Sequence, residues 1–91
     1  MTTVSEILTP AIDFLSNLKP EEQHLFLVML ETANRLHHKQ SLPDMAFFQK
    51  TKTVDDYWKA CTGGLFLLEE TLRKYPNMSV NVVKNKLFES I

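Results

Sequence analysis

The stretch that decides the fold is VDDYWKACTGGLFLLEETLRKY, residues 54–75. Its apolar residues alternate between spacings of four and three, a seam formed by Val54, Trp58, Cys61, Leu65, Leu68, Leu72 and Tyr75. Residues at these spacings lie on one face of an α-helix, because the helix completes a turn about every 3.6 residues. The stretch therefore predicts one long amphipathic helix and an all-α fold.

Two adjacent glycines, Gly63 and Gly64, stand in the middle of this predicted helix. Each costs about 1 kcal/mol of helix stability relative to alanine, so the pair needs a compensating contact. We expect close packing to supply it, because Ala60, Gly64 and Thr71 share one side and would form a groove of small residues for a neighbouring helix. The alternative is a hinge or a break at Gly63.

Four further segments carry helical signals. A capping-box spacing opens the first at Thr3, and we expect a kink rather than a restart at Pro10 because the apolar phase continues through it. Pro20 and Pro43 suit the first positions of the next two helices, and Ser79 suits the cap of the last. The sequence predicts a small bundle of four or five helices, over about residues 3–18, 20–38, 43–50, 54–75 and 79–90.

Length and composition predict one folded domain, residues 1–91, since 44% of the residues are hydrophobic and 23% are charged. The net charge of −1 gives no general attraction to nucleic acid or to an anionic membrane. The chain has one cysteine, no signal-peptide pattern and no apolar run of membrane-spanning length. We therefore expect a cytoplasmic protein that does not enter a membrane.

The segment 20–38 is expected to be the second central helix, antiparallel to the helix over 54–75. At about 100° per residue, its core-facing side would hold Leu25, Phe26, Met29, Ala33 and Leu36. Leu27 falls on the far side of this helix, among polar residues. An apolar side chain at that place needs another explanation.

No residue pattern in the chain predicts chemistry. His37 and His38 are adjacent and point about 100° apart, while His24 lies about 21 Å from His38 along the helix, so the three cannot share a metal ion. Cys61 lies on the apolar seam, where a thiol acts as a small hydrophobic side chain. The sequence therefore predicts no metal, no cofactor, no small-molecule substrate and no enzymatic activity.

Several large apolar residues do not fit a single core-facing stripe. Fully burying four of them would contribute about 6–12 kcal/mol, against an association cost of about 4–15 kcal/mol. Association is therefore permitted but not required, and the alternative is that the central helices are buried on several sides. In so small a domain we favour a partner-binding surface, centred on Phe66 and Leu67 and formed by Leu27, Phe47, Phe48, Phe66 and Leu67.

The favoured function is a non-enzymatic protein–protein interaction module: a small cytosolic adaptor, regulator or inhibitor whose apolar helix face binds a protein partner, a second copy in a homodimer, or both. The alternative is a nucleic-acid-associated helical regulator that uses the segment 35–52, whose net charge is +3. In that case Lys39, Lys50 and Lys52 would contact phosphates.

Overall fold

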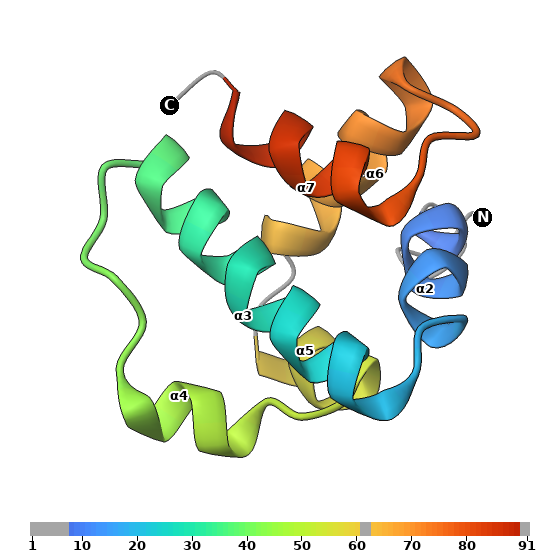
Figure 1. Cartoon of the computed structure of the whole chain (residues 1–91). Helices are drawn as coiled ribbons and strands as arrows, with labels where there is room; N and C mark the ends of the chain where they lie inside the picture. Colours follow the sequence, from blue (N-terminus) through green and yellow to red (C-terminus); the bar gives the residue numbers. More distant parts are fainter. Residues whose placement is uncertain (1–7, 61–62, 90–91) are drawn as a thin grey trace, which may run out of the picture.

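The computed structural model describes residues 8–60 and 63–89. Within these ranges it contains six helices and no strand, which confirms the prediction of an all-α bundle (Figure 1). The helices are α2 (Thr9–Ser16), α3 (Pro20–His37), α4 (Met45–Lys50), α5 (Val54–Ala60), α6 (Gly63–Lys74) and α7 (Val80–Phe88).

The starts of three helices follow the local signals in the sequence. α3 begins at Pro20, whose fixed φ angle suits the first helical position. Before α5, Thr53 Oγ1 accepts from the Asp56 N–H at 3.2 Å, and Asp56 Oδ2 accepts from the Thr53 N–H at 3.3 Å. Ser79 Oγ accepts from the third N–H of α7 at 3.3 Å. Each cap satisfies backbone donors that the helix itself leaves unpaired.

One helix starts later than predicted, and another begins at a proline inside a predicted helix. α4 begins at Met45 because the Asp44 carboxylate caps it, accepting from the Phe47 N–H at 2.9 Å. α2 begins at Thr9 with Leu8 as its N-cap and Pro10 in its first turn, so the structure supports a helix that starts at this proline and not the expected kink. The remainder of the predicted first helix, residues 1–7, lies outside the described residues.

The prediction of a single helix over residues 54–75 is wrong. α5 and α6 take its place, and their axes point in different directions (Figure 1). In one continuous helix Tyr57 and Gly64 would be about 10 Å apart along the axis, with the tyrosine side chain tilted toward the N-terminus. Instead, a Cβ atom at Gly64 would overlap the Tyr57 hydroxyl group. The structure therefore supports the alternative, a break near Gly63, and Gly64 admits the Tyr57 side chain rather than a neighbouring backbone.

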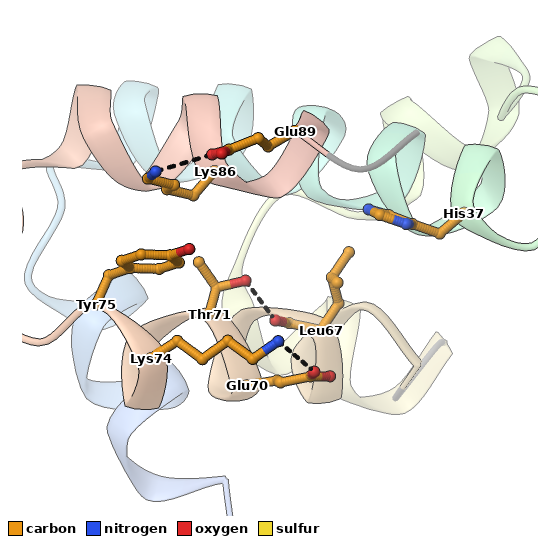
Figure 2. Close-up of a pocket in the computed structure, with 8 residues that line it drawn as sticks. All are labelled: His37, Leu67, Glu70, Thr71, Lys74, Tyr75, Lys86 and Glu89. Carbon is orange, nitrogen blue, oxygen red and sulfur yellow. Dashed lines mark hydrogen bonds and ion pairs between the residues drawn. The ribbon is translucent and has the colours of Figure 1, made fainter.

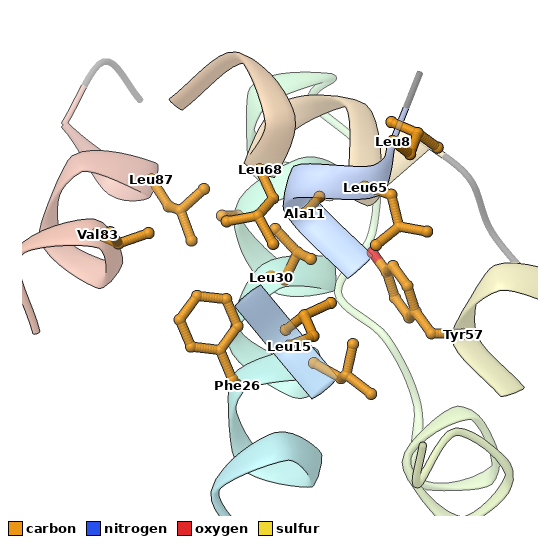
Figure 3. Packing of buried hydrophobic residues seen from close by; sticks show 12 residues of the cluster. Leu8, Ala11, Leu15, Phe26, Leu30, Tyr57, Leu65, Leu68, Val83 and Leu87 are labelled. Carbon is orange, nitrogen blue, oxygen red and sulfur yellow. The ribbon is translucent and has the colours of Figure 1, made fainter. Parts of the chain in front are cut away.

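The core lies around α3 and α6. α3 packs against α2, α5, α6 and α7, and α6 packs against α2, α3 and α7. Figure 3 shows apolar side chains from these helices meeting at the centre. The fully buried ones are Leu8, Ala11, Leu15, Phe26, Leu27, Leu30, Ala33, Tyr57, Leu65, Leu68, Val83 and Leu87.

The orientation of α3 differs from the prediction. Its buried residues are Phe26, Leu27, Leu30, Glu31, Ala33 and Asn34. Leu25, which was predicted to face the core, is 62% exposed, whereas Leu27, which was predicted to face outward, is fully buried. The physical reason is that the surrounding helices cover the side that carries Glu31, whose carboxylate accepts from the Tyr57 hydroxyl at 2.9 Å and from Arg35 Nε at 2.7 Å. A buried carboxylate is tolerated there because it is hydrogen-bonded and paired.

Candidate functional site

The residues predicted to bind a partner do not form one surface. Leu27 belongs to the core, and this corrects its assignment to a binding surface. Leu67 is half-buried and lines a groove between α3, α6 and α7, whereas Phe66 is 45% exposed and lines a different, acidic pocket on α6. Phe47 and Phe48 lie on α4.

Both phenylalanines of α4 have contacts within the chain. The Phe47 ring meets the Tyr57 ring edge to face, with centroids 6.3 Å apart, and the Arg35 guanidinium lies 5.5 Å from the Phe47 centroid. The Phe48 carbonyl accepts from His24 Nε2 at 2.9 Å. These contacts hold α4 against α3 and α5. The Phe47 ring packs against the core, whereas the ring contact of Phe48 is with Phe47, edge to face with centroids 6.3 Å apart.

A different set of apolar residues is left open, on the side of α3 away from the core. We call it the outer face of α3, and it consists of the apolar residues Leu25, Met29 and Leu36 and the polar residue Thr32, at spacings of four, three and four. Leu25 is 62% exposed and the other three are partly exposed. Met29 and Leu36 are not among the partly buried apolar residues that pack against the core in the described ranges. In Figure 1, α3 lies in the foreground with no other helix in front of it.

The outer face is apolar along its length and charged at its ends. The Thr32 hydroxyl donates to the Val28 carbonyl at 2.8 Å, so burying Thr32 would leave no donor unpaired. Glu21 and Glu22 lie in the first turn of α3, and Lys39 follows its last turn. All three charged residues are exposed. Lys52 also lies at the first end, where it lines a pocket with Glu21 and Leu25, so Glu21, Glu22 and Lys52 together carry a net charge of −1 there, and Lys39 carries +1 at the other end.

The groove between α3, α6 and α7 is the most polar candidate site. Its volume is about 330 Å³, and Figure 2 shows the residues that line it: His37, Leu67, Glu70, Thr71, Lys74, Tyr75, Lys86 and Glu89. The Lys74 ammonium pairs with Glu70 at 3.2 Å and the Lys86 ammonium with Glu89 at 2.9 Å.

The groove satisfies its own polar groups. Lys86 also lies 4.5 Å from the centroid of the Tyr75 ring, and its hydrogen bond to Glu89 raises the pKa of Lys86 above the ordinary lysine value. His37 Nε2 donates to the Leu87 carbonyl at 2.8 Å, and this bond joins the C-terminal ends of α3 and α7. Because each lysine already has a carboxylate partner on its own helix, the groove offers little net charge to a ligand.

Two buried carboxylates tie helices together. Glu31 joins α3 to Tyr57 of α5, as described above. Glu69 of α6 accepts from the Ala11 N–H of α2 at 3.1 Å and from Arg73 Nε at 2.9 Å. Both carboxylates are almost fully buried and hydrogen-bonded, so they stabilise the packing of helices and do not present an accessible acid or base.

The three lysines predicted to contact nucleic acid are not gathered in one patch. Lys39 follows the C-terminus of α3, whereas Lys52 lines a pocket with Pro20 and Glu21 at the N-terminus of the same helix. The 18 residues of α3 make it about 27 Å long. Lys50, at the end of α4, is close in sequence to Lys52 and far from Lys39 along the chain. Lys52 moreover shares its pocket with an acidic residue.

Within residues 8–60 and 63–89, no group of three or more His, Cys, Asp or Glu side chains could hold a metal ion, and no helix is both long and apolar enough to cross a membrane. Cys61, predicted to be a core residue, lies outside the described residues. Comparison of the chain with protein-family models, curated proteins and solved structures found no match.

The outer face of α3 could not be recognised from the sequence, because it overlaps a continuous run of apolar residues. Residues 25–30 are six consecutive apolar residues, so apolar side chains cover every side of this part of the helix. Periodicity alone then identifies two faces and cannot say which is buried. Leu25, Met29 and Leu36 were predicted to face the core, and the structure instead places them, with Thr32, on the partly exposed side of α3.

Proposed function

We propose that the protein is a non-enzymatic protein-interaction module of the cytosol, an adaptor, regulator or inhibitor, and that the outer face of α3 is its binding surface. The observation that supports this is the seam of Leu25, which is exposed, and Met29, Thr32 and Leu36, which are partly exposed, on a helix whose opposite side forms the core. Spacings of four and three are those at which one helix packs along another. The partner is therefore an apolar helix that lies along α3.

The outer face suits this role better than Phe66 does. The seam extends from Leu25 to Leu36, about 16 Å along the helix, so several apolar side chains can be buried together. Phe66 shares its pocket with Glu69, Glu70 and Arg73, and a single exposed aromatic residue among charges needs no partner. The nucleic-acid alternative lacks comparable support, because its lysines lie at opposite ends of α3.

Affinity capture with paired variants tests the proposal. The double variant Leu25→Gln, Met29→Gln makes the outer face polar, and Phe66→Gln is the matched control at an exposed apolar residue outside α3. We expect the double variant to lose proteins of the native cell that the unaltered chain retains, and the control to keep them, with circular dichroism still helical for both.

Two outcomes would contradict the proposal. If Phe66→Gln alone abolished capture, the binding surface would lie on α6, as the sequence first suggested. If the unaltered chain and the double variant retained the same proteins, the outer face of α3 would take no part in binding.

A further inference from the structure

We propose that the outer face of α3 binds the same face of a second copy of this chain, with the two α3 helices antiparallel about a two-fold axis. This inference rests on the proposed function, because it uses the same face, and it adds the identity and the orientation of the partner helix. Three features of α3 support it: the symmetry of the seam, the placement of charge and the satisfied hydroxyl of Thr32.

The seam is complementary to itself. Its spacings of four, three and four read the same in both directions. When the two-fold axis crosses α3 midway between residues 30 and 31, Leu25 lies opposite the partner's Leu36, and Met29 lies opposite the partner's Thr32. Symmetry repeats both pairs, so every seam residue meets another seam residue, as a closed dimer with a self-complementary interface requires.

The charges at the two ends match in the same register. Lys39 follows the C-cap of α3 with a φ angle of 55°, so Glu22 lies near the partner's Lys39, beyond the last paired turn, once at each end of the interface. Both residues are exposed, and no ion pair is described for either within residues 8–60 and 63–89. A parallel arrangement would instead bring Glu22 beside the partner's Glu22 and Lys39 beside the partner's Lys39. Charge therefore favours the antiparallel pair, and so do the opposed helix dipoles.

Burial of this face creates no unpaired polar group. The Thr32 hydroxyl is already bonded to the Val28 carbonyl, and the backbone groups in the middle of α3 are bonded within the helix. The contact consists of three apolar residues and Thr32 from each copy, which is small for a protein interface. We therefore expect a weak dimer whose population rises with concentration from the micromolar to the millimolar range.

Sedimentation equilibrium of the purified chain tests the inference. The mass of the unaltered chain is expected to rise with concentration from 10.5 kDa toward twice that value. Glu22→Lys places lysine near the partner's Lys39, and Lys39→Glu places glutamate near the partner's Glu22. Since each dimer contains two such pairs, each variant should dissociate roughly tenfold more readily.

Mixing the two variants gives the decisive result. In a mixed dimer both end pairs again join lysine to glutamate, so the mixture should associate about as well as the unaltered chain although each variant alone does not. Asp13→Lys, at an exposed residue of α2, is the control for the change in net charge and should associate like the unaltered chain.

The inference would be overturned by a monomeric mass at every concentration, or by a mixture that associates no better than its two components. If the chain is monomeric but its capture of other proteins still depends on Leu25 and Met29, the proposed dimer is refuted and the proposed function stands. If capture too were independent of those residues, both would fail.

Discussion

Leu25 and Leu27 are a matched pair for testing the orientation of α3, because both are leucines of the same helix and they lie on opposite sides of it. Leu27 is fully buried, and truncating a buried leucine to alanine costs about 2–5 kcal/mol. Leu25 is 62% exposed. The three carbons removed there contribute about 0.8 kcal/mol each when buried, and only about two fifths of the side chain is buried, so we expect Leu25→Ala to cost about 1 kcal/mol.

Urea unfolding followed by circular dichroism, at a concentration where the chain is monomeric, measures both losses. A difference of about 2 kcal/mol corresponds to about 8–16 °C in Tm for a domain of this size. Leu27→Ala should therefore unfold at clearly lower urea and temperature than Leu25→Ala, with a similar dependence on denaturant. Equal losses, or a larger loss at Leu25, would mean that α3 is rotated by about half a turn. The outer face and the dimer would then both be refuted.

Two further predictions concern the contacts that hold α6. Gly64→Ala places a methyl group against the Tyr57 side chain and should destabilise the fold by about 1–3 kcal/mol. Gly63→Ala is the control: its added atom would lie 3.2 Å from a side-chain amide, and we expect it to be nearly neutral. Equal Tm values for the two variants would contradict the break between α5 and α6. Glu69→Leu leaves the Ala11 N–H without its acceptor and should cost about 1–3 kcal/mol, while Glu69→Gln, which retains an acceptor, should cost less in denaturant unfolding.

The helical class and most helix starts could be predicted because their causes are local. Pro20, Thr53 and Ser79 act on backbone groups within four residues of themselves, and those residues can be read directly from the sequence. The Asp44 cap was missed for an equally local reason: Pro43 offered a competing first position for the helix. Such errors move the start of a helix by a residue or two without changing the fold.

The orientation of α3 could not be predicted in this way, because its cause lies elsewhere in the chain. Glu31 can face the core because Tyr57 of α5 donates to it and Arg35 pairs with it, and Tyr57 reaches that place because α5 and α6 are separate helices. A continuous helix over 54–75 would have carried Tyr57 away from Gly64. The wrong prediction of one helix over residues 54–75 and the wrong orientation of α3 therefore have the same cause, which is the contact between Tyr57 and Gly64.

The same reasoning explains why the sequence pattern favours a binding surface on α6, whereas the structure leads us to propose one on α3. Residues 65–68 and residues 25–30 are both uninterrupted apolar runs, and each has more apolar sides than one core-facing stripe needs. In α6, neighbours in the core and in the groove with α7 bury the run except for Phe66.

In α3 the neighbouring helices cover the side of Leu27 and leave the side of Leu25, Met29 and Leu36 partly open. A helix that is apolar on two opposite sides is ordinarily buried on both. Since the described helices bury only one side of α3, the other side is where a second molecule would complete the packing.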